Sequence, residues 1–164
     1  MIRAPPEGAK WPNSSVVDGT SFLGRLQART GLNFDLPTEA QWEYACRAGT
    51  TSTYYWGNEL SSLYARYKRS TTSGVLVVGS LRPNNWGLYD MSGNMWELCL
   101  DWYGQLAYGT DPKGSTSGEK RVIRGGGWSD LSSSGSSCTS SVRGELLPEA
   151  TSYTVGFRVS WTIP

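Results

Sequence analysis

The chain has 164 residues, a length typical of one domain, and a net charge of +1 with no long run of either sign. This balance argues against a nucleic-acid partner, and no apolar stretch approaches the ~20 residues of a membrane span. The chain contains 20 Gly, 8 Trp and 9 Tyr but no His. Because glycine at this level implies many tight turns, the composition predicts a loop-rich α+β domain.

Three cysteines, Cys46, Cys99 and Cys138, are present, but no two have CxxC spacing. Without histidine, they do not form a zinc pattern. We interpret Cys46 and Cys99 as small buried hydrophobic residues. The sequence leaves open whether any of the three pair.

The first 15 residues contain three Pro and few apolar side chains, and predict an extended arm before a single domain over 16–164. They lack the apolar core of a signal peptide. We therefore expect a soluble protein, cytoplasmic or, if an upstream leader was removed, secreted or at the cell surface. Asp18 is placed to cap a helix that runs to about Thr30. Its expected inner face consists of Phe22, Leu23 and Leu26.

A second helix is predicted from Thr38, because Thr38 and Gln41 match a capping box in which each side chain satisfies a free backbone N–H. This helix should end before Gly49. Beyond it, the pattern changes to turns and short strands. We expect a strand at 75–78, a turn at 83–87, a polar loop at 109–120, a strand at 121–123 stopped by three glycines, and a last strand at 156–161.

The segment 128–155 is rich in Ser and Thr, yet it lies between two predicted strands. Serine-rich linkers are usually flexible, but a linker would not be framed by RGGGW and GFRVSW. Cys138 and Arg143, within the segment, have the character of anchors. The side chains between these positions follow neither a helical nor a strand period. This pattern predicts a displayed binding face rather than a linker, because loops on rigid scaffolds commonly carry binding.

Four motifs occur in an order that is specific: LPTEAQWEYACRAGT at 36–50, NNWGLYDMSGNMWELCLDWY at 84–103, RVIRGGGW at 121–128 and GFRV at 156–159. Together they resemble the formylglycine-generating-enzyme, or sulfatase-modifying-factor, domain family. The resemblance covers nearly everything from Val16 onward. It implies a C-type-lectin-like α+β fold with two helices, short antiparallel strands and much irregular loop.

The catalytic members of that family hold copper with a cysteine pair between the RGG and GFR motifs. With this chain aligned on Arg124 and Arg143, the two cysteine positions fall on Gly135 and Ser140. Neither residue can supply a thiolate, and the single Cys138 cannot rebuild a two-thiolate copper site. The resemblance therefore implies the fold without the chemistry: no catalytic residue, no required cofactor and no enzyme activity.

Family members also bind calcium, and the resemblance places one structural site at Asn94 and Glu97, whose oxygen atoms suit a hard cation. The alternative is that Asn94 holds a turn and Glu97 pairs with a polar group of the core. A second family site would fall at Arg66, where a cationic side chain opposes calcium.

The tail resembles more closely the variable proteins of diversity-generating retroelements, in which fixed positions alternate with mutable ones. The fixed set here would be Trp128, Cys138, Arg143, Pro148 and 156–158. The resemblance implies a protein or cell-surface ligand bound by a hypervariable face. The predicted ligand-binding residues are Trp128, Ser129, Asp130, Leu131, Ser137, Thr139, Val142, Gly144, Glu145, Leu146, Leu147, Glu149, Ala150, Ser152, Tyr153 and Thr154.

Other interpretations remain open at this stage. The chain could be an ordinary non-catalytic family member with a serine-rich tail, a divergent formylglycine-generating or related oxidase, or a structural module of a larger secreted protein. Asp90, Glu97 and Asp101 are close in sequence and could suggest paired-carboxylate hydrolysis. Their place in the family's core motif favours a structural role.

Overall fold

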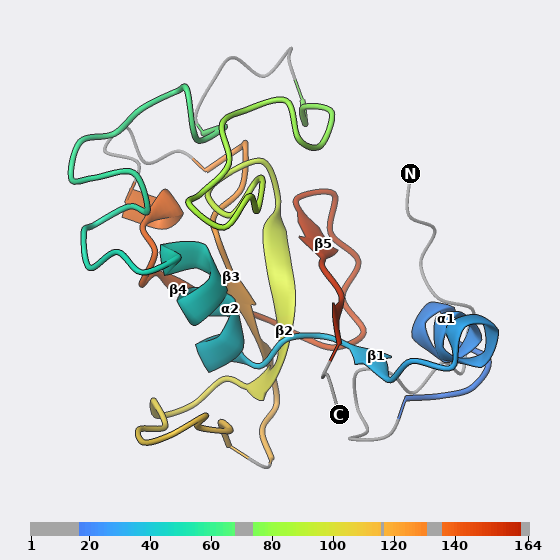
Figure 1. Ribbon diagram of the computed structural model, residues 1–164. Coiled ribbons are helices and arrows are strands. Elements are labelled where there is room, and N and C mark those ends of the chain that lie inside the picture. The colour runs from blue at the N-terminus through green and yellow to red at the C-terminus, as the bar shows by residue number, and fades with distance from the viewer. Residues whose placement is uncertain (1–16, 68–73, 116, 131–135, 162–164) are drawn as a thin grey trace.

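The computed structural model describes residues 17–67, 74–115, 117–130 and 136–161. The expected arm at 1–15 lies outside these residues. Two α-helices and six short strands are joined by long irregular loops, as Figure 1 shows. The elements in chain order are α1 (Phe22–Thr30), β1 (Phe34–Asp35), α2 (Glu39–Arg47), β2 (Trp96–Trp102), β3 (Arg121–Arg124), the 3-10 turn η1 (Ser136–Cys138), β4 (Arg143–Leu146), β5 (Val155–Phe157) and β6 (Ser160–Trp161).

Helix α1 begins three residues later than the Asp18 cap predicts. Ser21 is the N-cap and accepts from the backbone N–H of Gly24, while Asp18 accepts from the backbone and hydroxyl of Thr20 in the preceding turn. Leu23 is buried as expected, but Phe22 is 58% exposed and contacts the ring of Phe157 edge-on. Placing Phe22 on the inner face was therefore wrong: it is the first residue of the helix, and its ring packs against Phe157 at the surface.

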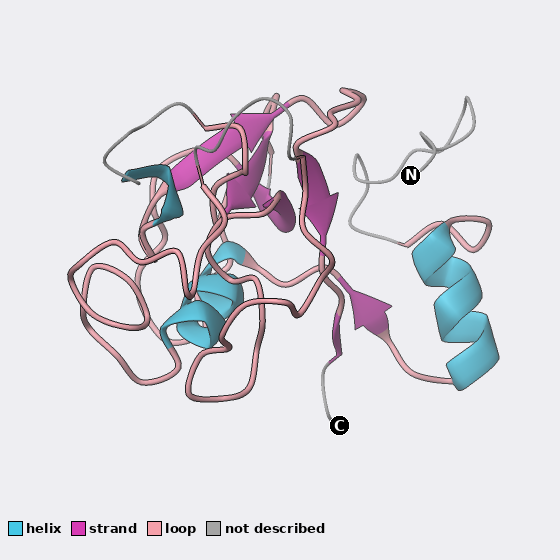
Figure 2. Cartoon of the chain, turned by 90° about the horizontal axis from the view of Figure 1, so that it is seen from above, coloured by secondary structure: helices cyan, strands magenta, loops and turns pink. Residues whose placement is uncertain are grey.

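Helix α2 has the predicted capping box, with Thr38 and Gln41 satisfying each other's backbone N–H. Its inner face carries Trp42, which is fully buried and packs with Cys46, Met91, Cys99 and Val122 in the core. This face covers one side of the larger sheet, and Figure 2 shows α2 on that side.

The larger sheet has the strand order β4-β3-β2-β5. Burial alternates along β2, as the period of two requires, and Glu97, Cys99 and Asp101 point toward α2. A smaller sheet pairs β1 with β6, so that Phe34 lies opposite Trp161.

Two strand predictions were wrong. Residues 75–78 form a loop, because the side-chain amide of Asn94 bonds both the N–H and the C=O of Leu76 in place of a partner strand. The strand expected at 156–161 is split into β5 and β6, since the Arg158 side chain turns to pair with Glu97 between them. In addition, β5 pairs parallel with β2, so the strands are not all antiparallel.

The connection 147–154 crosses the sheet. Since β3 is antiparallel to both β2 and β4, while β5 is parallel to β2, the strands β4 and β5 point the same way at opposite edges. The chain must therefore pass over a face of β3 and β2 between them. Helix α2 occupies one face, so the connection passes over the other, as Figure 1 shows.

Candidate functional site

The strand register divides the predicted binding residues between two ends of the sheet. Arg124 lies opposite both Glu97 and Arg143, and Trp96 lies opposite Val155. We call this the Trp96 end of the sheet. The predicted residues in the segments that adjoin it are Trp128, Ser129, Asp130, Ser137, Thr139, Val142, Ser152, Tyr153 and Thr154.

The remaining predicted residues lie elsewhere. Leu146 is opposite Arg121, so Glu145, Leu146 and Leu147 belong to the far end of β4. Glu149 and Ala150 are in the crossing connection, and Leu131 is outside the described residues. The sixteen residues therefore do not form one compact patch, and the Trp96 end gathers the larger group.

An aromatic pair dominates the Trp96 end. The rings of Trp128 and Tyr153 are 6.3 Å apart, and Tyr153 is 79% exposed. The Trp128 indole N–H is buried and has no hydrogen-bond partner among the described residues. Since the two rings come from opposite ends of the 128–155 segment, the fold brings together what the sequence separates.

Asp130 and Gly144 act as parts of the frame. The two carboxylate oxygens of Asp130 accept from the indole N–H of Trp96 and the backbone N–H of Gly127. Gly144 faces inward, and a Cβ there would lie 2.8 Å from Cγ1 of Ile123. Neither residue presents a free side-chain group to a ligand.

The backbone of the segment is held by contacts that do not depend on its side chains. The backbone N–H groups of Trp128 and Ser140 donate to the carbonyls of Asn94 (2.9 Å) and Thr53 (3.0 Å). At the other end of the segment, Thr154 accepts from the N–H of Trp96 at 2.9 Å. These bonds use only the backbone atoms of the segment.

Arg124 provides the strongest of these anchors. Its side chain is fully buried, and its guanidinium donates to the carbonyls of Ser140 (3.0 Å), Ser141 (2.8 Å) and Val142. It also pairs with Glu43 of α2. One buried cation thus connects the residues just before β4 to helix α2.

Two further arginine–glutamate pairs secure the segment. Arg143 binds Glu39 through two hydrogen bonds of 2.6 and 2.8 Å, and this contact raises the pKa of Arg143. Arg158 binds Glu97 in the same manner at 2.5 and 2.7 Å. Such bidentate pairs add geometric specificity as well as energy.

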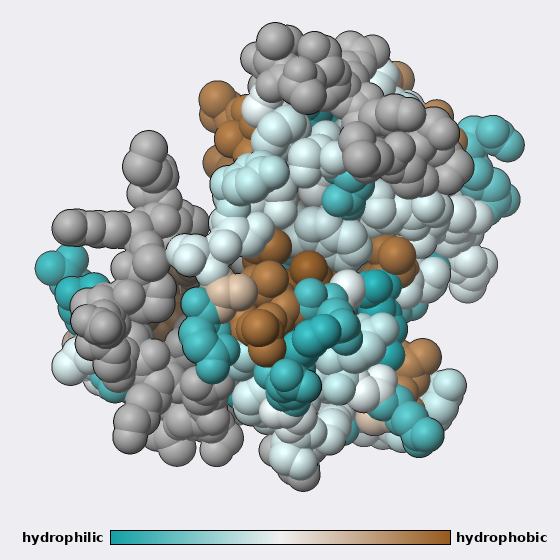
Figure 3. Space-filling model, turned by 180° about the vertical axis from the view of Figure 1, so that it is seen from behind, coloured by the Kyte–Doolittle hydropathy of each residue, from teal (hydrophilic) through white to brown (hydrophobic). Residues whose placement is uncertain are grey.

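Figure 3 views the molecule from the side opposite to that of Figure 1, away from α2. Hydrophobic surface on this side is confined to separate brown patches among pale and teal areas. The crossing connection contributes several exposed side chains of mixed character: Leu147, Glu149, Ala150 and Tyr153. This mixture has no core-like pattern.

The cysteines do not fit a copper centre. Cys46, Cys99 and Cys138 are unpaired and fully buried, and Ser140 is also fully buried. Gly135 lies outside the described residues. Burial raises the pKa of the Cys46 thiol to about 11 and that of Cys138 to about 12, and it raises the pKa of Cys99 as well. These thiols are protonated at neutral pH, whereas a soft metal binds thiolate.

We expect Ellman's reagent to label none of the three cysteines of the native protein near pH ~8, and all three after denaturation. A thiol ionises in the unfolded chain near pH ~8.5, below its raised native pKa. The contribution of the thiols to the free energy of unfolding should therefore be constant below the thiol pKa of the unfolded chain. It should fall as the pH rises toward about 11, the pKa of Cys46. Rapid labelling of one thiol in the native protein would contradict this account.

Asn94 and Glu97 do not fit a calcium ion. The Asn94 side chain is used by Leu76, with its oxygen accepting at 2.9 Å, and Asn94 adopts a φ of +66°. Glu97 is paired with Arg158 and also accepts from the Trp42 indole N–H at 2.7 Å. Within the described ranges, no group of three or more acidic, cysteine or histidine side chains is placed to hold a metal. The geometry matches the structural alternative for both residues.

We therefore expect millimolar calcium to leave the melting temperature unchanged relative to a sample with chelator. A ligand that binds only the native state would raise it by mass action. Differential scanning calorimetry provides the measurement, with magnesium as the control cation. A calcium-specific increase of several degrees would show that the native protein binds calcium and would contradict this expectation.

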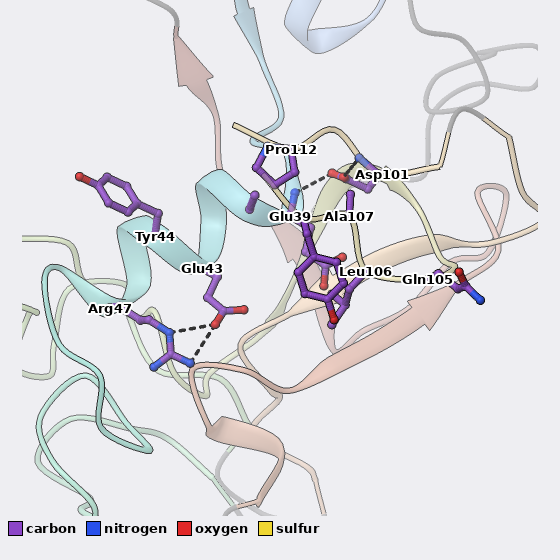
Figure 4. A pocket seen from close by; sticks show the side chains of 12 residues that line it. Glu39, Glu43, Tyr44, Arg47, Asp101, Gln105, Leu106, Ala107 and Pro112 are labelled. Atoms are coloured by element: carbon purple, nitrogen blue, oxygen red, sulfur yellow. Dashed lines mark hydrogen bonds and ion pairs between the residues drawn. The ribbon is translucent and has the colours of Figure 1, made fainter. Parts of the chain in front are cut away.

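No carboxylate pair is free for acid–base catalysis at the hollow between α2 and the 104–114 loop. Figure 4 shows this hollow, of about 390 Å³. Glu39 and Glu43 line it but are paired with arginines, and Asp101 accepts from two backbone N–H groups. The hydrolase interpretation of Asp90, Glu97 and Asp101 thus has no support from the contacts of Glu97 or Asp101.

The sequence interpretation also missed exposed apolar residues. Val77 and Val78 are 81% and 80% exposed, although the pattern predicted a strand for them. A run of β-branched residues indicates either a strand or an apolar loop, and only the contact with Asn94 distinguishes the two.

No helix among the described residues has the length and apolar character to cross a membrane.

The fold, with its small sheets, two helices and long loops, defines a C-type-lectin-like domain of the formylglycine-generating-enzyme type. Residues 8–163 match the model of the sulfatase-modifying factor enzyme 1-like domain. The chain belongs to this family.

Among its relatives, the formylglycine-generating enzyme of Streptomyces coelicolor is 33% identical over 181 residues, covering 93% of this chain and 56% of that protein. The serine/threonine-protein kinase pkn1 of Chlamydia pneumoniae is 35% identical over 165 residues, covering 96% of this chain and 25% of that protein. This chain therefore spans at most about half the length of these relatives.

Similar solved structures include the following two. Treponema denticola variable protein 1 has a TM-score of 0.67 and 34% identity, with 78% of this chain and 47% of that chain covered. PvdO from Pseudomonas aeruginosa has a TM-score of 0.72 and 26% identity, with 86% and 57% covered. The family thus includes formylglycine-generating enzymes as well as a variable protein.

Proposed function

We propose that this domain is a non-enzymatic ligand-binding domain that displays a hypervariable, retroelement-diversified surface at the Trp96 end of its sheet. Its ligand is a protein or a cell-surface molecule. One observation carries the proposal: the 128–155 segment is anchored through its backbone, by Arg124, Asn94, Thr53 and Trp96. A segment anchored in this way can exchange its exposed side chains without losing its position.

The similarity to Treponema denticola variable protein 1 supports this proposal. The principal alternative is a divergent formylglycine-generating enzyme, favoured by the identity to the Streptomyces coelicolor enzyme. The buried, protonated thiols of Cys46 and Cys138 argue against it, because copper oxidase chemistry requires accessible thiolate ligands.

The two functions are distinguished by a turnover assay. The protein is titrated with copper in the presence of a sulfatase-motif peptide, and conversion of the peptide cysteine to formylglycine is followed by mass spectrometry. The Streptomyces coelicolor enzyme serves as the positive control. We expect no conversion by this protein, and robust turnover would overturn the proposal.

Diversification has its own test at the level of DNA. We expect a reverse-transcriptase gene nearby, together with a near-repeat of the DNA that encodes residues 128–158. The two copies should differ at template adenines. Without such a repeat, the interpretation reduces to a non-catalytic family member with a fixed serine-rich tail.

A further inference from the structure

The loop 74–80 carries apolar side chains that point into solvent. Val77 and Val78 are 81% and 80% exposed, and Val75 is 49% exposed. Clustered exposed apolar residues mark interaction sites more often than single ones do. The segment therefore requires an explanation beyond the fold.

This loop is held in a defined conformation. Both backbone groups of Leu76 are bonded by the Asn94 side chain, at 2.9 and 3.3 Å. The N–H of Gly79 donates to Asp90 at 2.7 Å, and the hydroxyl of Ser80 donates to the Val77 carbonyl at 2.6 Å. The valines are thus presented on a fixed backbone, which lowers the entropy cost of binding.

Asn94 connects this loop to the candidate binding face. Its side chain holds Leu76, and its backbone carbonyl accepts from the N–H of Trp128 at 2.9 Å. Trp128 in turn packs against Tyr153. Figure 1 shows the 74–80 loop, in green, and the 125–130 segment, in orange, beyond the same end of β2.

The predicted binding residues of the Trp96 end carry little available charge. Among the predicted binding residues of the Trp96 end, Asp130 is the only ionisable acid or base apart from the Tyr153 phenol. Its carboxylate is already used by Trp96 and Gly127. The rest of that set consists of the two aromatic residues, Val142 and five serines and threonines. Interface centres have this composition, because charged residues are depleted there and aromatic residues enriched.

We propose that Val77 and Val78 are the constant apolar half of the binding surface, at the same end of the sheet as the Trp128–Tyr153 pair, and that the partner presents an uncharged, apolar protein surface. This inference rests on the proposed function, and it names both a fixed contact and the chemistry of the partner. The segment 128–155 sets which partner binds, while the valines contribute affinity to any of them.

The test uses a phage-displayed library of random peptides selected against the full chain. We expect enriched peptides to be rich in apolar and aromatic residues, and their affinity to change little between low and high salt, since apolar contacts are not screened. The double variant V77S/V78S should weaken them by at least about tenfold. The double variant L106S/Y108S is the matched control, because it removes exposed apolar side chains from the 104–114 loop at the opposite end of β2.

A third variant, Tyr153→Ser, separates the two proposals. If Tyr153→Ser weakens the peptides while V77S/V78S does not, the binding face stands and the role of the valines is refuted. If neither variant weakens them, the peptides bind elsewhere and both proposals fail. Enrichment of charged peptides, or of none, overturns the assigned partner chemistry. Circular dichroism melting curves establish that each variant is folded.

Discussion

Replacing Arg124 with Met should lower the free energy of unfolding by about 3–5 kcal/mol, the loss typical when one partner of a buried ion pair is removed. The substitution leaves the carbonyls of Ser140, Ser141 and Val142 without this donor and removes one of the two arginines that pair with Glu43. Methionine fills part of the volume but cannot donate a hydrogen bond. Because small domains have only about 5–15 kcal/mol of stability in total, this loss removes a large share of it.

Urea unfolding monitored by tryptophan fluorescence measures this loss. Arg47→Ala provides a matched control, since Arg47 also pairs with Glu43, one helical turn away, but its side chain is partly exposed whereas that of Arg124 is fully buried. Pairs that water can reach contribute no more than about 1 kcal/mol. Similar losses for the two variants would mean that Arg124 does not anchor the segment.

The variant Gly126→Ala should be destabilised by about 2–5 kcal/mol, from backbone strain together with steric overlap. Gly126 has a φ of +81°, and a Cβ there would lie 2.5 Å from the carbonyl oxygen of Ser137. That oxygen belongs to the backbone of η1, so it cannot rotate away as the end of a side chain can. Relief of the overlap would push η1, and with it Cys138, out of its packed position.

Gly104→Ala is the control, because an added Cβ there meets only Ser115, at an ordinary 3.7 Å. Differential scanning calorimetry should show a melting temperature close to that of the parent for Gly104→Ala and a large decrease for Gly126→Ala. An unchanged melting temperature for Gly126→Ala would indicate that the turn after β3 is not the rigid start of the binding segment.

Local signals in the sequence were sufficient for several elements. The capping box at Thr38 and Gln41 predicts α2 because the bonds it describes are made between residues three apart. The strand at Arg121 was predicted for a similar reason, since the three glycines that stop it follow directly. The ordered family motifs predicted the fold class, which the matched family model and the similar structures confirm.

The errors arise where a residue's conformation depends on a distant partner. Residues 75–78 have strand-like composition, but the partner of Leu76 is the Asn94 side chain, 18 positions away. Likewise, Arg158 interrupts the last strand because Glu97 lies 61 positions earlier in the chain. No local pattern encodes either contact.

The predicted binding residues show the same limit. Periodicity could not indicate that the Asp130 carboxylate accepts a hydrogen bond from Trp96, or that Gly144 faces Ile123. Both contacts depend on the order of strands in the sheet. Conversely, the sequence separates Trp128 from Tyr153, and the crossing connection brings their rings together.

The central claim is that the 128–155 segment displays its exposed side chains on a frame that is stable without them. Its most direct test is the urea unfolding curve of one quadruple variant, L147S/E149S/A150S/Y153S. It replaces exposed side chains across the crossing connection and leaves the backbone anchors in place. The account predicts that the free energy of unfolding falls by no more than about 2 kcal/mol, most of it from the Tyr153–Trp128 contact. A loss as large as that expected for Arg124→Met would show that these side chains hold the fold together, and would contradict the view that they are displayed on an independent frame.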